Sequence, residues 1–299
     1  MQIWAVGGGK GGTGKSLVAN GLCQGLAERG FRVIIVDADY GGPNQHTYCG
    51  VRKPATSLIQ FFDDRVALED LVVETPVKGL FLIPGSFNSP STDSIAYTQK
   101  QKLFRHLRLL KADHVVLDLG AGSNYDTLDT FLMANIQIGV ITPDALAIEN
   151  FYLFLKKLKF RQLGNVLSLV RLKEQARQIW KERGAHGISN LSEFIQYLRP
   201  LSPDFDQRLT REQGNLFVRV ILNQVREYRQ VESGQAVNSS MHKYFQINGA
   251  FAGYLRYDKD LWQQFGQDHP TACAPSFTLH HALDGVLDGI LKLPVREEG

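Results

Sequence analysis

The hydrophobic positions of the chain gather into short runs rich in β-branched residues, separated by longer stretches with helical spacing. The runs are continuous rather than alternating, which is typical of strands buried on both faces of a sheet. We expect strands at 2–6, 32–38, 80–84, 114–119, 136–142, 216–225 and 251–255, and helices at about 15–29, 96–111, 126–134, 145–162, 231–246 and 277–291. The pattern predicts an α/β fold, with a doubly wound, mostly parallel sheet and helices on both of its faces.

One interval is longer than the connections that this architecture normally uses. About fifty residues, 165–215, separate the helix that ends near Arg161 from the strand 216–225. They contain two helix-like stretches, RLKEQARQIWKER and LSEFIQYL, followed by the proline-containing segment RPLSPDF. We therefore predict a single domain over residues 1–299 that carries a two-helix insertion at about 165–215.

The charge of the whole chain leaves the class of partner open. The 299 residues include 33 Lys and Arg against 30 Asp and Glu, a net charge of +3. Residues 156–229, however, contain 15 Lys and Arg against 7 Asp and Glu, a net of +8, which leaves −5 for the remainder. This basic segment is either a solvated helical face or a docking surface for nucleic acid or an acidic partner.

The cysteines and the apolar stretches exclude several classes of protein. Cys23, Cys49 and Cys273 are scattered and never form a CxxC pair, which argues against a disulfide framework, a zinc site or an iron–sulfur cluster. No stretch approaches the roughly 20 consecutive apolar residues of a membrane span, and the first residues lack the long apolar core of a secretion signal. We therefore expect an enzyme of the cytoplasm.

The first predicted strand is followed by GKGGTGKS, which fits the phosphate-loop pattern GxxxxGKS and opens the first helix. In such a loop the backbone N–H groups face the β-phosphate, and the helix N-terminus adds the positive end of its dipole. Lys15 would neutralise β- and γ-phosphate oxygens, and the Ser16 hydroxyl would bind Mg²⁺. We expect nucleotide contacts from the whole loop: Gly9, Lys10, Gly11, Gly12, Thr13, Gly14, Lys15 and Ser16.

Two further strands end in acidic residues, at the edge of the sheet where open α/β folds bind ligands. Asp37 and Asp39 end the second strand in DADYGGPN, and their spacing of two sends both side chains the same way. Asp118 ends the strand HVVLDL and precedes glycines, as in a Walker B motif. By themselves these acids could serve as turn and cap residues. Because the carboxyl ends of the strands form the ligand crevice in such sheets, we expect Asp37 and Asp39 to lie beside the phosphate loop.

An additional lysine at the start of the loop, Lys10 in KGGTGKS, makes the chain resemble the MinD/ParA family of deviant Walker A P-loop ATPases. The resemblance extends to the DxD segment with its following glycines and asparagine. It implies an ATP-dependent homodimer in which Lys10 reaches the nucleotide of the partner subunit and stabilises charge on the γ-phosphoryl group. It also implies that Asp37 holds the hydration shell of Mg²⁺, Asp39 orients the attacking water, and Asn44 contacts water or phosphate.

The resemblance assigns further roles near the ends of later strands. Asp118 would accept hydrogen bonds from Mg²⁺-bound water, while Gly120 and Gly122 would let the next loop move with the γ-phosphate. Asn223, at the end of VILNQV, would hydrogen-bond the adenine ring, the alternative being a simple turn residue. The later loop GYLRYDKD resembles the segment that packs against the base, but it lacks the proline that relatives have there.

The last predicted helix, 277–291, has an apolar stripe that suits either packing on the sheet or lying on a membrane. Membrane-surface helices are rich in Lys and Arg on their polar face. This helix instead shows His281, Asp284 and Asp288, with only Lys292 as a cation. We expect it to pack on the protein, and we expect no stable membrane anchoring.

These features predict a Mg²⁺-dependent ATPase that works as a dimerisation switch, with Lys10, Lys15 and Asp39 as its catalytic residues. ATP would join two subunits, slow hydrolysis would separate them, and the dimer would bind a protein cargo or activator. The expected role is spatial positioning or partitioning, as in chromosome partitioning, cell division or flagellar placement. FlhG-type regulators carry an N-terminal activating segment, whereas this chain enters its first strand at Gln2, so we do not expect it to activate a flagellar GTPase by that route.

Two alternatives stay open at this point. A partition protein would bind DNA nonspecifically through residues 156–229 in the presence of ATP. A ligase or kinase on the same fold would act on a small molecule and would consume ATP only when that substrate is present.

Overall fold

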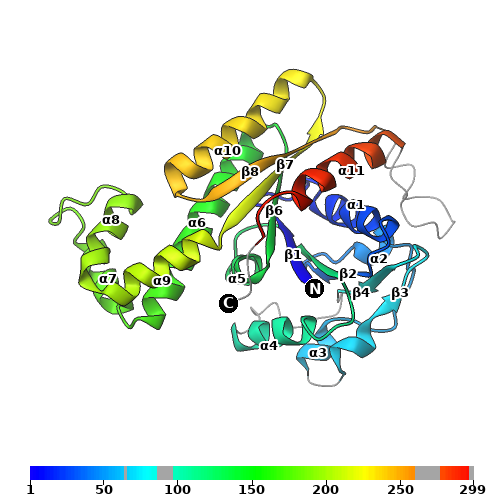
Figure 1. Ribbon diagram of the computed structural model, residues 1–299, viewed down its shortest axis with the longest axis horizontal. Helices are drawn as coiled ribbons and strands as arrows, with labels where there is room; N and C mark the ends of the chain where they lie inside the picture. Colours follow the sequence, from blue (N-terminus) through cyan, green and yellow to red (C-terminus); the bar gives the residue numbers. More distant parts are fainter. Residues whose placement is uncertain (64–65, 86–96, 260–276, 296–299) are drawn as a thin grey trace.

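The computed structural model describes residues 1–63, 66–85, 97–259 and 277–295. Within these residues the strands form an eight-stranded sheet in the order β3-β4-β2-β5-β1-β6-β7-β8 (Figure 1). All neighbouring strands are parallel except β3 and β4. The strands are β1 (Gln2–Gly7), β2 (Val33–Ala38), β3 (Val73–Glu74), β4 (Leu80–Ile83), β5 (His114–Leu119), β6 (Ile136–Ile141), β7 (Phe217–Val225) and β8 (Asn248–Arg256).

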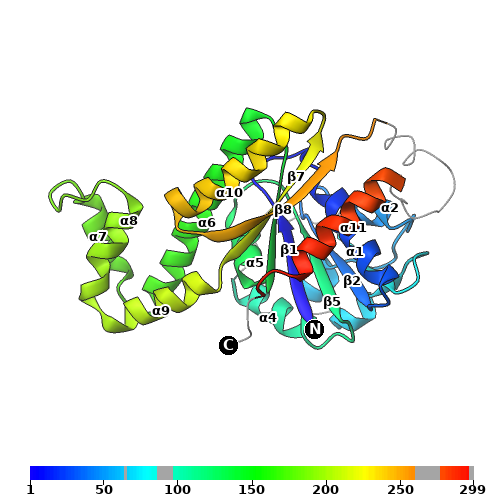
Figure 2. The same cartoon turned by 45° about the horizontal axis from the view of Figure 1, so that its top comes forward.

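Helices cover both faces of this sheet and connect its strands. Figures 1 and 2 show α1 and α11 side by side, as their mutual contacts require. Short helices and 3₁₀ turns fill the connections: α2 (Gln45–Tyr48), α3 (Ile59–Phe62), η1 (Leu68–Leu71) and η3 (Tyr228–Gln230). The covering helices are α1 (Lys15–Glu28), α4 (Tyr97–Leu107), α5 (Tyr125–Met133), α6 (Ala145–Leu169), α10 (Val231–Phe245) and α11 (Phe277–Leu291).

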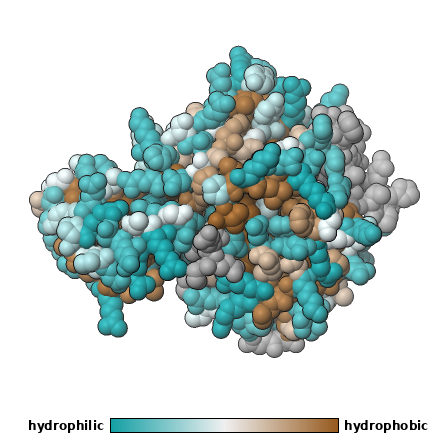
Figure 3. All heavy atoms as spheres, viewed as in Figure 1, coloured by the Kyte–Doolittle hydropathy of each residue, from teal (hydrophilic) through white to brown (hydrophobic). Residues whose placement is uncertain are grey.

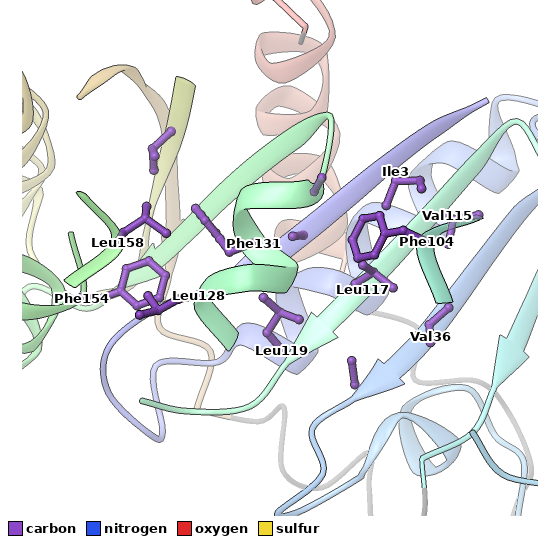
Figure 4. Packing of buried hydrophobic residues seen from close by; sticks show 14 of the residues in the cluster. Ile3, Val36, Phe104, Val115, Leu117, Leu119, Leu128, Phe131, Phe154 and Leu158 are labelled. Atoms are coloured by element: carbon purple, nitrogen blue, oxygen red, sulfur yellow. The ribbon is translucent and has the colours of Figure 1, made fainter. Parts of the chain in front are cut away.

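Successive residues of the central strand β1 are buried on opposite faces of the sheet. Ile3 and Ala5 belong to the core beneath α4, α5, α6 and α10, which Figure 4 shows from close by. Trp4 and Val6 belong to the core beneath α1 and α11. Because both faces are covered, the strands need no polar side, and this is why they read as continuous apolar runs. The predicted doubly wound α/β sheet is confirmed.

The apolar stripe of α11 is buried against α1 and the sheet, as its sequence pattern predicts. The stripe residues are at most 4% exposed. The approach to α1 is close, since a Cβ at Gly21 would lie 2.5 Å from Leu283 Cδ1. None of the helices in the described residues has the length and apolar character needed to cross a bilayer. The buried stripe consists of Leu279, Leu283, Val286, Leu287 and Ile290.

The predicted insertion forms a lobe that projects from the sheet at the left of Figures 1 and 2. It contains three helices rather than the two expected: α7 (Lys173–Lys181), α8 (Leu191–Leu198) and α9 (Pro203–Gly214), with the turn η2 (Arg199–Leu201) before the last. The prolines had suggested a loop, but Pro203 occupies the first turn of α9, where its missing N–H costs nothing. Ser202 Oγ caps this helix by accepting a hydrogen bond from Phe205 N at 3.2 Å.

The helix α6 also runs further than predicted, to Leu169 rather than to about residue 162. Its apolar spacing continues through Leu163, Val166 and Leu167, which are buried in a separate core inside the lobe. One helix therefore belongs both to the covering of the sheet and to the lobe. The assignment of residues 1–299 to a single ATPase domain stays a prediction. So does the description of this lobe as an insertion in that domain.

A buried ion-pair network joins α4, α5 and α6. The carboxylate of Asp129 is 1% exposed and lies between two cations. Its Oδ2 is 2.7 Å from Lys100 Nζ, and its Oδ1 is 2.5 Å from Arg161 Nε. Lys100 also lies 3.0 Å from Asp126 Oδ1. The network therefore fixes the helix that follows the Walker B strand to its neighbours on both sides.

Replacing Asp129 with alanine should lower the free energy of unfolding by about 3 kcal/mol, because two largely buried cations lose a shared partner. Urea denaturation monitored by circular dichroism measures the change. The control is Asp204→Ala, which removes an exposed pair with Arg208 and should cost less than about 1 kcal/mol. Equal losses in the two variants would contradict the importance of the buried network.

Candidate nucleotide-binding site

The loop between β1 and α1 has the backbone that a phosphate loop requires. Gly12 and Gly14 have φ values of +77° and +87°, a left-handed conformation that side chains disfavour. At Gly9 the restriction is space, because a Cβ there would lie 2.1 Å from the carbonyl oxygen of Asn150 in α6. The conformation of this loop therefore depends on glycine at several of the predicted positions.

The two lysines of the loop lie in different surroundings. Lys15 is 6% exposed, and its Nζ donates a hydrogen bond to the carbonyl oxygen of Lys10 at 3.0 Å. Burial lowers the pKa of Lys15, while the carboxylates of Asp118 and Asp39 oppose this shift. The side chain of Lys10 is 37% exposed, and its Nζ lies 3.0 Å from Asp144 Oδ1. Lys15 thus faces the carboxylates, whereas Lys10 lies at the outer rim.

No sequence motif pointed to Asp144, which follows β6 and holds Lys10. Asp144 Oδ1 also accepts from Ala147 N at 2.9 Å, so this residue caps the N-terminus of α6. Burial is the largest single influence on the pKa of Asp144 and raises it, but hydrogen bonds from Thr142, Lys10 and Ala147 together outweigh burial and leave the pKa below its ordinary value. An acidic residue between a strand and a helix predicts a cap, but not a contact across 134 positions.

Asp37 and Asp118 lie side by side at the ends of β2 and β5. The register of the two strands pairs them directly, and both side chains are fully buried. Asp37 accepts backbone hydrogen bonds from Asp39 at 3.2 Å, Asn44 at 2.8 Å and Gln45 at 2.9 Å. The Oδ1 of Asp118 has no hydrogen-bond partner among the described residues. The strand pairing therefore brings two predicted metal-binding carboxylates together.

The electrostatics of these two carboxylates favour a bound cation. Burial raises the pKa of Asp37 to about 6 and that of Asp118 to about 7, and their mutual repulsion contributes to the Asp118 shift. A divalent cation reverses such shifts by stabilising the charged forms. No cluster of three His, Cys, Asp or Glu in the described residues could hold a metal alone. The site fits Mg²⁺, which typically takes one or two carboxylates together with phosphate oxygens and water.

Gln45 connects the parts of this site, although no motif pointed to it. Its side chain is fully buried, and its Nε2 donates to Asp118 Oδ2 at 2.8 Å and to the Ser16 carbonyl oxygen at 2.9 Å. Its backbone N–H binds Asp37, as described above. The neighbouring Asn44 has a side-chain oxygen that is buried without a partner in the described residues. A single residue therefore joins the first helix to both acidic strand ends, through its side-chain amide and its backbone N–H.

Asp39 lies where the two loops after β2 and β5 meet. Its Oδ1 accepts from the backbone N–H groups of Gly41 and Gly42, each at 3.1 Å. A Cβ at Gly120 would lie 2.7 Å from this same oxygen, so the loop after Asp118 requires glycine here. Two residues later, Gly122 has a φ of +97°. Displacing one loop would therefore disturb the other.

The structure places Asn223 against the phosphate loop. Asn223 is 3% exposed, and its Nδ2 donates to the Thr13 carbonyl oxygen at 2.9 Å. A Cβ at Gly14 would lie 2.2 Å from that nitrogen. The next residue, Gln224, has a φ of +60° and donates from Nε2 to the Gly12 carbonyl oxygen at 2.9 Å. The end of β7 thus braces the loop, and the role of Asn223 toward adenine stays a prediction.

The segment expected to pack against the base begins at the end of β8. Tyr257 N donates to the Val225 carbonyl oxygen at 3.0 Å, and the Arg226 guanidinium lies 4.2 Å from the centre of the Tyr257 ring. Asp260, the last residue of that segment, lies outside the described residues, as does Cys273. The other two cysteines, Cys23 and Cys49, are buried free thiols.

Comparison with known proteins identifies the family. Residues 4–271 match the model of the CobQ/CobB/MinD/ParA nucleotide binding domain. The chain belongs to this family. Membership agrees with the geometry above, in which the phosphate loop, the two paired carboxylates and the loop after Asp118 lie together at the carboxyl ends of β1, β2 and β5.

Relatives of the chain include proteins named for determining cellular sites. It is 30% identical over 154 residues to the flagellum site-determining protein YlxH of Helicobacter pylori, a match covering 51% of this chain and 52% of YlxH. It is 28% identical over 181 residues to the septum site-determining protein MinD of Synechocystis, covering 60% of this chain and 67% of MinD. The chain thus spans about half the length of YlxH.

A solved structure shows the same fold. The septum site-determining protein MinD from Pyrococcus horikoshii, complexed with Mg-ADP, superimposes with a TM-score of 0.58 at 16% sequence identity. The match covers 97% of this chain and 96% of that one. The predicted P-loop fold is therefore confirmed over nearly the whole length.

The raised pKa values predict how stability depends on pH without metal. Because Asp37 and Asp118 have pKa values above 3.8, the ordinary value, the folded protein binds their protons more tightly than the unfolded chain does. Their contribution to the free energy of unfolding therefore falls as pH rises from about 4 to about 7.

The variant Asp118→Asn removes one of these groups. Relative to wild type, it should gain at least about 1 kcal/mol of stability between pH 4 and pH 8 in the presence of EDTA. Urea denaturation at several pH values measures this gain, with Asp70→Asn, at an exposed position, as the control. If both variants gained the same stability, the raised pKa of Asp118 in the folded protein would be contradicted.

Proposed function

We propose that the chain is an ATP-dependent dimerisation switch of the MinD/ParA type that positions or partitions a cellular cargo. The observation that carries the proposal is the separation of the two lysines of the phosphate loop. Lys15 is buried and faces the acidic strand ends, whereas Lys10 lies at the rim with a 37% exposed side chain. A rim lysine can reach a nucleotide held by a second subunit, and a buried one cannot.

The residues of the crevice supply the parts of phosphoryl transfer. Backbone N–H groups of the loop and Lys15 would bind the phosphates, and Asp39 would orient the attacking water. Ser16, Asp37 and Asp118 would hold Mg²⁺, directly or through water. Bound there, the ion would neutralise charge on the β- and γ-phosphate oxygens. Burial of the acids and Gln45 keeps these groups in place before the nucleotide arrives.

Lys10 is held by a weak contact in the isolated chain. Its ion pair with Asp144 is exposed on both sides, at 37% and 48% of the side chains. Such pairs contribute at most about 1 kcal/mol, so a second subunit could displace Lys10 at little cost. Once released, Lys10 would act on the γ-phosphoryl group of the partner subunit in the way an arginine finger does.

The names of the relatives favour a role in positioning. YlxH and MinD are described as flagellum and septum site-determining proteins.

The alternative function, a small-molecule ligase or kinase, would need its substrate in order to consume ATP. ATP turnover by the purified chain alone therefore decides between the two functions, and its absence would favour the ligase or kinase.

Replacing Asp39 with alanine should trap the dimer, because ATP would still bind while the attacking water would lose its orienting carboxylate. Light scattering with saturating Mg·ATP should then give twice the monomer mass of 33.5 kDa. The control is Glu69→Ala, which changes an exposed acid away from the crevice. An Asp39→Ala protein that stays monomeric with Mg·ATP would show that the switch mechanism is wrong.

Replacing Lys10 with alanine should leave ATP binding by the monomer nearly unchanged. Hydrolysis should fall by about 10³-fold, the lower end of the effect of a finger residue. Replacing Lys15 with alanine should instead abolish nucleotide binding. Equilibrium binding of a fluorescent ATP analogue and steady-state phosphate release distinguish the two variants. Undiminished hydrolysis in Lys10→Ala would show that Lys10 is only a solvated loop lysine.

A further inference from the structure

Two hollows on the side of the lobe meet along α6. One of about 530 Å³ lies between the start of α5 and α6, and another of about 400 Å³ lies between α6 and α7. They share Phe160, Gly164 and Lys173, so they form one continuous depression that we call the lobe groove. Its two ends are marked by Tyr125, next to the loop after Asp118, and by Trp180 in the lobe.

The charged side chains that line the groove are mostly basic. They are Lys157, Arg161, Lys173 and Arg177, against the single carboxylate Glu174 among the lining residues described. Glu174 lies 3.9 Å from Arg177, and Arg161 is paired with the buried Asp129. Both lysines lie at exposed positions. The groove therefore attracts an acidic ligand.

The floor of the groove is apolar and aromatic. Leu128, Leu163 and Leu167 line it from α5 and α6, together with the half-buried ring of Phe160. The Trp180 ring closes one end and lies 5.7 Å from the Phe160 ring. Figure 3 shows hydrophilic side chains over most of the lobe, with hydrophobic patches between them. A ligand that fits must combine acidic groups with apolar side chains.

This combination favours a peptide over duplex DNA. DNA is held mainly through its phosphates, and a duplex has no apolar side chains to place in a concave floor. Several arginines of the basic segment 156–229 are also paired with carboxylates, as in Arg199 with Asp206 and Arg208 with Asp204. An amphipathic helix uses both properties of the groove, with apolar residues on the floor and acids at the rim.

We propose that the lobe groove docks an acidic amphipathic helix of a partner protein. Its occupancy would also depend on the nucleotide, an extension that rests on the proposed function. Ser123 and Asn124, which line the groove, directly follow Gly122, and Asn124 caps α5 by accepting from Thr127 N at 2.8 Å. Movement of the loop after Asp118 therefore changes one end of the groove.

Gly164 offers a direct way to block the groove. A Cβ at this position would have no heavy atom within 4 Å, so a longer side chain would enter the groove without displacing the backbone. Glycine is also the less favourable residue inside a helix, by about 1 kcal/mol relative to alanine. The variant Gly164→Met should therefore fold and fill the groove, while Gly164→Ala should fold and leave it open.

Random displayed peptides of about 16 residues, long enough for four helical turns, are selected on the nucleotide-free wild-type chain alone. The recovered peptides should be acidic, with apolar residues three and four positions apart. Fluorescence anisotropy should show at least about tenfold weaker binding to Gly164→Met than to wild type or Gly164→Ala. Peptides that are not acidic, or that bind Gly164→Met equally well, would overturn the proposal.

Two neighbouring lysines provide the charge control. Lys157 lines the groove, whereas Lys156, also exposed on α6, is not among the residues that line it. Lys157→Glu should weaken peptide binding about fivefold or more, and Lys156→Glu should change it by less than about twofold.

A DNA duplex of about 30 base pairs is tested as a competitor of the bound peptide at about 0.15 M salt. Displacement of the peptide by this duplex would assign the groove to nucleic acid and overturn the proposal.

The dependence on nucleotide is measured separately. Peptide affinity in Mg·ATP and in Mg·ADP should differ by at least about threefold, a modest coupling free energy. Equal affinities would overturn the link to the switch. Selection on the nucleotide-free chain does not require ATP, so failure of the proposed function and failure of the groove give different results.

Discussion

The structure depends on the parallel pairing of β2 with β5, which places Asp37 directly opposite Asp118. Two carboxylates at this spacing, both fully buried, destabilise the fold when both are charged. Helices on both faces of the sheet keep water away, and this makes the repulsion stronger. The pairing is tolerated because backbone N–H groups hold Asp37 and because the Gln45 amide binds Asp118. A bound cation would remove the remaining repulsion, so that its binding would favour the geometry that the fold already imposes.

Gln45 makes this arrangement cooperative. Its backbone holds one acid, and its side chain holds the other together with the carbonyl oxygen of Ser16. A shift of the loop after β2 would thus disturb hydrogen bonds at the start of α1 and at the end of β5 at the same time. The close approach of Gly120 to Asp39 brings the loop after β5 against the loop after β2. These contacts link the loops of the site to one another, as the proposed switch would require.

The sequence was sufficient to predict those parts of the molecule that depend on a local pattern of residues. Strands such as β1 were predictable because successive residues such as Ile3 and Trp4 are buried by helices on opposite faces. The phosphate loop was predictable because glycine alone fits its conformation. Gln45 and Asp144 were missed because their roles come from contacts between distant segments, which no spacing encodes. The helix α9 was missed because Pro203 resembles a breaker unless the capping by Ser202 is known.

The long helix α6 connects features that the sequence presents separately. It has 25 residues and is therefore about 37 Å long. Its first turn is capped by Asp144, which holds Lys10, and the Asn150 carbonyl packs against Gly9 of the phosphate loop. Its second half builds the lobe groove and pairs with α5 through Arg161. Because a packed helix moves as a rigid body, a ligand in the groove and a second subunit at the rim would act on one element. In the proposed switch, the lobe would then couple partner binding to the position of Lys10.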